Sequence, residues 1–293
     1  MPCQVSLEKL KPSEPLAKFK ILFKGKARGN DVITLPTFTW PFLVFSLGTC
    51  IGSFLNVCIC RLPQDRSVVR PGSACPKCGH RLKWWENIPI LSFLFLRAKC
   101  SSCGARISLQ YPLVELLSGL LALALWYKFG LGPEVFIYFY FSACLIIVTF
   151  VDLEHQIIPD AVSLPGIALG FLSSFFLPEL SWWDSLLGII MGGGILLLVA
   201  WGYYIIARRE GMGGGDIKLL AMIGAFLGWQ AIPLVILLSA AVGSVTGLAI
   251  MAVQKGDRHM AIPYGPFLAG AALISLFWGR ELTAWYLIFI SRG

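Results

Sequence analysis

Four cysteines in two closely spaced pairs form the first group of residues that could do chemistry. Two residues separate Cys75 from Cys78 and Cys100 from Cys103, and residues 79–99 lie between the pairs. Two such pairs at this spacing are typical of a tetrahedral zinc site with four thiolate ligands. Four thiolates leave no open position for a catalytic water, so we expect a structural ion that stabilises the surrounding loop. The alternatives are a set of reduced thiols or a redox dithiol. His80 is expected beside the site and not as a metal ligand.

Two aspartates next to apolar segments form the second group. Asp152 ends an apolar run, and Asp216 follows three glycines at the start of another. An ionisable residue at membrane depth is costly and indicates a functional site. Two carboxyl groups that share a site do not both ionise easily, so one can accept a proton from water while the other donates one. We therefore predict that Asp152 and Asp216 are a catalytic pair. The alternative is that both only cap helices.

The helix ends predict a division of roles within this pair. Asp152 is expected at the C-terminal end of its helix, which disfavours an anion, and Asp216 at an N-terminal end, which favours one. We therefore expect Asp216 to deprotonate water and Asp152 to donate the proton. Of the other acidic residues, Asp160 is expected to cap a helix, and Glu115 to pair with a helix terminus or with Arg106.

The composition excludes several classes of protein. Of the 293 residues, 57% are hydrophobic and only 14% are charged, whereas a soluble domain carries about 25% charged residues. A soluble enzyme and a disordered chain are therefore not expected. The nine cysteines are an odd number and several lie in apolar runs, which also argues against a secreted disulfide scaffold.

Long apolar runs predict an all-α polytopic membrane protein with about eight transmembrane helices, because unpaired backbone cannot face lipid. The runs are 38–60, 111–128, 134–151, 161–177, 184–207, 217–229, 230–253 and 262–279. The predicted regions are a charged N-terminal tail (1–37), a first transmembrane helix (38–60), a zinc-binding loop (61–110), a helical membrane core (111–279) and a C-terminal tail (280–293). Within the last, residues 281–290 are too short to span and are expected at the membrane interface.

Basic residues on alternate loops predict the orientation in the membrane. Loops with many basic residues face the cytoplasm. On this criterion the 61–110 loop and both aspartates are cytoplasmic, and the N-terminus lies outside. The seven basic residues of the 1–37 tail oppose this assignment. Because such loops account for the net charge of +8, a nucleic-acid partner is not expected. The loop's basic residues are Arg61, Arg66, Arg70, Lys77, Arg81, Lys83, Arg97, Lys99 and Arg106.

Ordered motifs along about residues 42–270 resemble those of bacterial type IV prepilin peptidases. The resemblance includes the two aspartate motifs, of which the second is similar to the GxGD signature of intramembrane aspartyl proteases. One departure is Ala98, where the family usually has glycine. The matching segments are Gly52–Val57 with Arg61–Pro63, Cys75–Cys78 through Trp84–Pro89 to Cys100–Cys103, Tyr111–Leu116, Asp152 with Ile158–Asp160, and Gly213–Leu219.

The resemblance implies an enzyme of the bacterial inner membrane with two activities. It would cut the basic leader from prepilins or pseudopilins after a glycine, and then N-methylate the new N-terminal residue with S-adenosylmethionine. Asp152 and Asp216 would be catalytic, and the four cysteines would hold zinc. Glu86, Glu154 and Asp160 are candidates for an acidic surface that receives the leader. The rival interpretations are a transporter, for which no convincing internal repeat is visible, and a membrane-anchored zinc module that docks partners.

Overall fold

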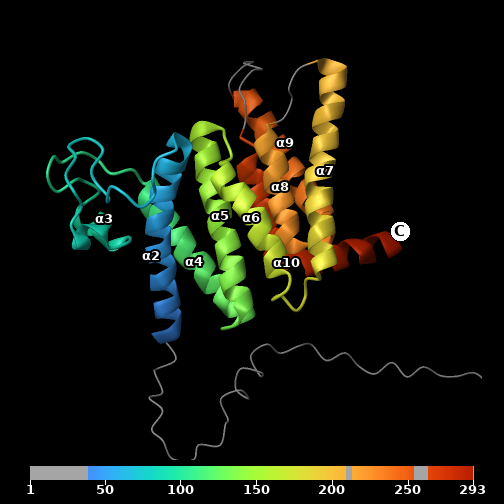
Figure 1. Ribbon diagram of the computed structural model, residues 1–293, viewed down its shortest axis with the longest axis horizontal. Coiled ribbons are helices and arrows are strands. Elements are labelled where there is room, and N and C mark those ends of the chain that lie inside the picture. Colours follow the sequence, from blue (N-terminus) through green and yellow to red (C-terminus); the bar gives the residue numbers. More distant parts are fainter. Residues whose placement is uncertain (1–38, 209–212, 254–262, 293) are drawn as a thin grey trace, which may run out of the picture. The chain divides into compact units, whose positions relative to one another are not determined.

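The computed structural model describes residues 39–208, 213–253 and 263–292 (Figure 1). The predicted tail over residues 1–37 lies outside them. In the described part, regular structure is helical, and β-pairing is limited to two isolated bridges. The α-helices are α2 (Thr39–Arg61), α3 (Leu91–Phe95), α4 (Gln110–Phe129), α5 (Pro133–His155), α6 (Asp160–Ser173), α7 (Trp182–Ala207), α8 (Gly214–Leu227), α9 (Ile232–Val253) and α10 (Gly265–Arg292).

The predicted all-α membrane class is confirmed, because each predicted apolar run coincides with one of the helices α2 and α4 to α10. In the part of the chain that the structure describes, five helices are long and apolar enough to cross a membrane. The 14-residue helices α6 and α8 are each about 21 Å long, less than a hydrocarbon core of about 30 Å. These lengths do not establish the predicted count of eight. Residues 281–290 continue α10 as one helix, and their place at the membrane interface stays a prediction.

The core of the bundle lies around α5, which packs against α4, α6 and α10. Its side chains at Phe141, Leu145 and Val148 are fully buried. Phe141 stacks on Phe226 of α8, with 4.7 Å between the ring centroids. Residues 141–148 of α5 are all buried, so side chains on every face hold the helix that carries Asp152 in its last turn.

Glycines bring α7 and α8 into backbone contact. A Cβ atom at Gly188 would overlap the Gly224 carbonyl group, and one at Gly192 would meet the Leu220 carbonyl group. Continuing this antiparallel register, Asp216 lies beside a point about ten residues, or about 15 Å, before the end of α7. The close packing therefore sets Asp216 well below the level at which α7 ends.

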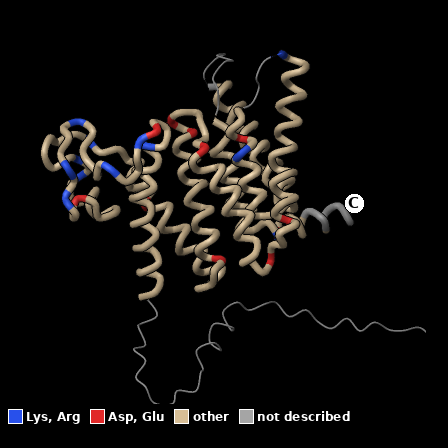
Figure 2. Tube along the Cα trace, viewed as in Figure 1, with Lys and Arg blue, Asp and Glu red and all other residues tan. Residues whose placement is uncertain are grey.

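Small residues also join α2 to α4. Cβ atoms at Gly48 and Gly52 would meet Ala122 and Glu115 on α4, and the buried Ser118 hydroxyl donates to the Gly48 carbonyl oxygen at 2.8 Å. These contacts fix the two helices between which the 61–110 loop is inserted. Figure 2 shows that Lys and Arg residues gather in this loop, whereas the middle parts of the helices carry few charges.

Candidate catalytic and metal sites

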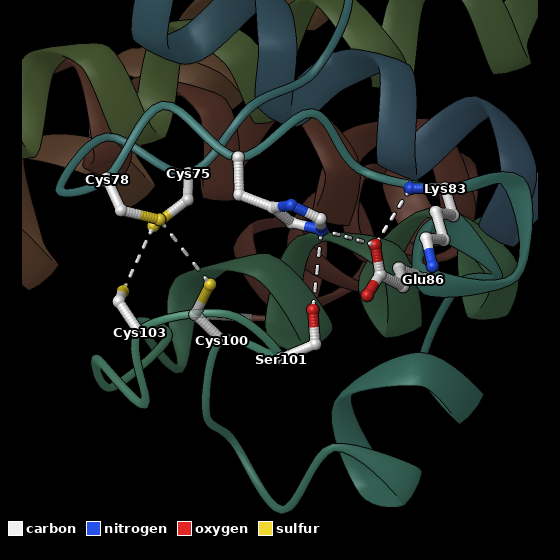
Figure 3. Close-up of polar contacts among 8 residues, drawn as sticks. Cys75, Cys78, Lys83, Glu86, Cys100, Ser101 and Cys103 are labelled. Atoms are coloured by element: carbon white, nitrogen blue, oxygen red, sulfur yellow. Dashed lines mark hydrogen bonds and ion pairs between the residues drawn. The ribbon is translucent and has the colours of Figure 1, made fainter.

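The four predicted zinc ligands lie in one cluster. Their Sγ atoms are all within 4.8 Å of one another. The Sγ atoms of Cys75 and Cys103 are 3.9 Å apart, and those of Cys78 and Cys100 are 4.0 Å apart (Figure 3). A tetrahedral ion with Zn–S bonds of about 2.3 Å requires sulfur atoms about 3.8 Å apart. The four cysteines therefore fit a single zinc ion. Their thiolates would fill all four coordination positions of a soft metal ion, so that no water would bind to it.

The two cysteine pairs have the same local structure. The Gly79 N–H donates to the Cys75 carbonyl oxygen (2.9 Å), and the Gly104 N–H donates to the Cys100 carbonyl oxygen (3.0 Å). Both glycines have a left-handed backbone, with φ of 71° and 69°. A residue with a Cβ atom adopts this backbone conformation only at a cost in free energy. This explains why glycine occupies the same place in each turn.

Backbone N–H groups in these turns also favour the thiolate form that binds a metal ion. Hydrogen bonds from the backbone N–H groups of Cys78 and Lys77 lower the pKa of the Cys75 thiol to about 6. The equivalent N–H groups of the second turn lower the pKa of Cys100. Because the thiolate is the metal-binding form, the backbone of each turn favours metal binding by the first cysteine of that turn.

Glu86 lies beside the two cysteine turns and is linked to them through His80 and Ser101 (Figure 3). The Lys83 N–H donates to Glu86 Oε2 (2.8 Å), and His80 Nε2 lies 3.2 Å from the same oxygen and 3.4 Å from the Ser101 hydroxyl. Hydrogen bonds from Lys83 and Ser101, with a smaller contribution from His80, lower the pKa of Glu86 to about 2. Glu86 is buried in this network, so its predicted place on an acidic receiving surface is wrong.

The fold brings together the two predicted catalytic aspartates. Asp152 lies three residues before the end of α5 and is buried, whereas Asp216 is the third residue of α8 and is half-buried. Gly215, next to Asp216, packs on Ile158, six residues after Asp152. Two aspartate motifs from segments far apart in the sequence are therefore neighbours in the fold.

Two further contacts join the motifs that carry these aspartates. A Cβ atom at Gly215 would lie 2.8 Å from the Ile158 Cβ atom, so the start of α8 packs closely on the segment between α5 and α6. The Lys218 Nζ atom forms an ion pair with Asp160 Oδ1 at 2.6 Å. Asp160, predicted as a helix cap, is the first residue of α6 and holds α8 through this pair.

Gly265 is a site residue that sequence reasoning missed. Its buried N–H, at the start of α10, donates to Asp152 Oδ2 at 2.8 Å, and a Cβ atom there would lie 2.7 Å from that oxygen. The only local signal is a glycine followed by Pro266 where a helix begins. Asp152 thus lies at the N-terminal end of α10, just as Asp216 lies at that of α8. The helix-end argument therefore no longer separates the roles of the two aspartates.

The side of Asp216 that faces the glycine run is open. Gly213 and Gly214 are exposed, and a Cβ atom at Gly214 would have no neighbour within 4 Å. Within the described residues, no hydrogen bond to the Asp216 carboxyl group is formed. Among the described residues, this carboxyl group therefore has no hydrogen-bonding partner that a water molecule would have to displace.

Glu115 pairs with a helix terminus, as one of the two sequence-based alternatives expected. Its Oε2 atom accepts a hydrogen bond at 2.7 Å from the N–H of Ile90, the residue that precedes α3. Arg106, the other expected partner, is exposed.

The arrangement defines a membrane protein with a paired-carboxyl site and a four-thiol site in separate regions. Residues 46–129, with the four cysteines, match the family described as Bacterial Peptidase A24 N-terminal domain. Residues 139–248, with both aspartates, match the family described as Type IV leader peptidase family. The chain therefore belongs to the type IV leader peptidase family, and it is a membrane peptidase.

Curated relatives cover most of the chain and carry the name "Prepilin leader peptidase/N-methyltransferase". The relative from Stutzerimonas stutzeri is 41% identical over 83% of this chain and 92% of its own length. Those from Pseudomonas aeruginosa and Aeromonas hydrophila are each 39% identical, over 83% and 84% of this chain and 92% and 93% of their own lengths. No solved structure matches the chain.

Proposed function

We propose that this protein removes the basic leader of type IV prepilins or pseudopilins after a glycine and then methylates the new N-terminus. The names of its relatives support both activities. The observation that supports the peptidase half is that the start of α8, with Asp216, packs on the segment that follows Asp152 at the end of α5. Paired carboxyl groups at membrane depth have no structural need and are costly there.

In the proposed mechanism, the two aspartates share the proton transfers of peptide hydrolysis. One carboxylate takes a proton from water as the water oxygen attacks the carbonyl carbon of the scissile bond. The other carboxyl group gives its proton to the carbonyl oxygen. When the tetrahedral intermediate collapses, the C–N bond breaks, and the leaving nitrogen takes the proton that the first carboxyl group accepted from water. A hydroxyl proton of the intermediate returns to the second carboxylate, so the leader ends in a new carboxyl group and the pilin begins with a new amine.

The depth of the site fits a substrate whose cleavage bond lies next to an apolar helix. Asp216 lies about 15 Å before the end of α7, at the open side of Gly213 and Gly214. We place this end of the bundle at the cytoplasm, because the basic 61–110 loop belongs to it. A basic leader would then stay outside the membrane while the bond reaches the aspartates. Glu154 is exposed near this end and remains a candidate to receive the leader.

The cofactors have separate roles in this proposal. Zinc would be held by Cys75, Cys78, Cys100 and Cys103, where it stabilises the fold of the loop. S-adenosylmethionine would supply the methyl group that the new amine accepts.

Mass spectrometry of a prepilin co-expressed with this protein tests both activities separately. We expect loss of the leader and, on the same product, the mass gain of one methyl group. A prepilin that keeps its leader beside folded enzyme would overturn the proposal, and loss of the leader without methylation would overturn its methyltransferase half.

A further inference from the structure

The segment between the two cysteine turns exposes large apolar side chains. Trp84 is 77% exposed, Leu94 is 64% exposed and Phe95 is 82% exposed, with Trp85 and Leu91 also exposed beside them. These residues lie on or next to α3 in a loop that the charge pattern predicts to be polar and basic. A contiguous apolar patch of this kind indicates a binding surface rather than a surface in water.

The start of α3 lies beside the C-terminal half of α2 and not beyond its end. Ile90 is hydrogen-bonded to Glu115, and Glu115 lies against α2, because a Cβ atom at Gly52 would be 2.7 Å from the Glu115 Cα atom. Gly52 lies nine residues, or about 14 Å, before the end of α2 at Arg61. Figure 1 agrees, since α3 lies at the height of the middle of α2 and not beyond its C-terminal end.

The Glu115 contact also satisfies a backbone N–H group of the loop. Irregular backbone is tolerated within a bilayer only where protein satisfies its polar groups. Ile90 has a left-handed backbone with φ of 60°, which a β-branched residue rarely adopts. Its N–H, at the start of α3, is satisfied by the buried Glu115 carboxyl group. A carboxylate inside the apolar bundle thus holds the backbone where the loop turns into α3.

Charge complementarity indicates what covers the exposed patch. The 61–110 loop has nine basic residues against Asp65 and Glu86, and Glu86 is buried. Lys83 lies over the Trp85 ring at 5.0 Å, and Arg97 and Lys99 are exposed just after α3. We name Lys83, Arg97 and Lys99 the basic rim. Tryptophans and cations around an apolar tip are typical of segments that lie in a membrane interface. The same rim would repel a basic leader, which argues against the substrate as the occupant.

We propose that α3 with Trp84 and Trp85 inserts into the lipid leaflet on the side of the 61–110 loop, and that the basic rim binds anionic phospholipid headgroups. The zinc region is then a membrane-inserted element beside α2, and not a domain suspended in the cytoplasm. This placement does not depend on the peptidase chemistry, so its test is independent of the test of the proposed function.

Depth-dependent quenching on the full-length protein in lipid nanodiscs tests the insertion. A genetically encoded fluorescent amino acid replaces Phe95 in one variant and Asp65, in the exposed turn after α2, in the matched control. Both variants are first shown to keep their zinc content. We expect spin-labelled acyl chains to quench the probe at 95 and aqueous iodide to quench the probe at 65. Quenching at 95 by iodide alone would overturn the proposal, as would quenching by neither, which would mean that protein covers the patch.

A second arm tests the headgroup. At equal mole fraction, spin-labelled phosphatidylglycerol should quench the probe at 95 at least twofold more than spin-labelled phosphatidylcholine. Changing Arg97 and Lys99 together to Gln should remove this preference while the probe stays in the leaflet. Equal quenching by both lipids in the unchanged rim would overturn the anionic-lipid half of the proposal.

Discussion

Asp152 is held at the site by two helices at once. Its own helix α5 delivers it to the bundle core, and the first N–H of α10 donates to its carboxyl group. The second contact needs a residue without a side chain, since any Cβ atom at position 265 would lie 2.7 Å from Asp152 Oδ2. Gly265 is therefore a positioning residue that acts through Asp152.

The change Gly265→Ala should lower the kcat of leader cleavage about tenfold to a hundredfold, because a hydrogen bond to a charged group is worth about 1.5–3 kcal/mol. The control is Gly270→Ala, in the same helix, where a Cβ atom has no neighbour within 4 Å. Steady-state kinetics with a purified prepilin measure both variants. Equal kcat values for the two variants, both folded, would contradict the positioning role.

Glu86 has a comparable role for the cysteine cluster, since it joins His80 beside the first turn to Ser101 in the second. The change Glu86→Gln removes the charge that these donors face. We expect zinc to transfer to a chelator about tenfold faster or more, the usual size of effect for a group that orients metal ligands. Glu154→Gln, at an exposed carboxyl group, is the matched control and should keep the wild-type rate. Indistinguishable rates for Glu86→Gln and wild type would show that the network is dispensable.

At the scale of elements, the depth of Asp216 depends on the contact between α7 and α8. This contact is made by backbone atoms at Gly188, Gly192 and Gly224, as is common where helices approach closely in membranes. A side chain at the contact would separate the helices and shift the start of α8, where Asp216 lies.

The change Gly188→Ala should therefore lower the free energy of unfolding by about 1–3 kcal/mol, the usual cost of overpacking, and reduce cleavage as well. Gly194→Ala, on the same helix but with open space around the added Cβ atom, should be neutral in both respects. Denaturant titration in mixed micelles measures the stability. A stable Gly188→Ala enzyme with full activity would refute the account of the α7–α8 contact.

The sequence predicts the long helices well because apolar length alone specifies them, and it predicts the ligand cysteines because their spacing is local. It does not predict α3, since a five-residue segment with four apolar residues in a basic loop gives no periodic signal. Gly265 and the Lys218–Asp160 pair also escape prediction, because their partners are 113 and 58 residues away. The division of roles between the aspartates stays a prediction, and the helix-end argument for it fails because α10, a distant helix, also begins at Asp152.

At the scale of the whole molecule, the cysteine cluster and the aspartates lie toward the same end of the helix bundle, so one orientation in the membrane applies to both. The C-terminal ends of α2, α5, α7 and α9 lie at the same end of the bundle, together with the 61–110 loop (Figure 1). The basic residues of that loop predict that this end faces the cytoplasm. Leader cleavage at that face requires the aspartates to be on the same side as the basic leader.

Accessibility labelling in intact cells should confirm this orientation. A cysteine introduced at Ser67, in the basic loop, should react with a membrane-impermeant thiol reagent only after the cells are opened. A cysteine at the exposed Pro178, between α6 and α7, should react from outside. The unaltered protein gives the background from the native thiols. Rapid labelling at position 67 in intact cells would reverse the topology.

The central claim is that Asp152 and Asp216 together cleave the leader, and purified, zinc-loaded Asp→Asn variants test it most directly. Each variant keeps the size of the side chain but removes a proton-transfer group, so each should lower the cleavage rate of a prepilin by about a hundredfold to ten-thousandfold. Asp65→Asn, at an exposed carboxyl group outside the site, should cleave at the wild-type rate. A folded Asp152→Asn or Asp216→Asn enzyme that cleaves the prepilin at nearly the wild-type rate would contradict the account.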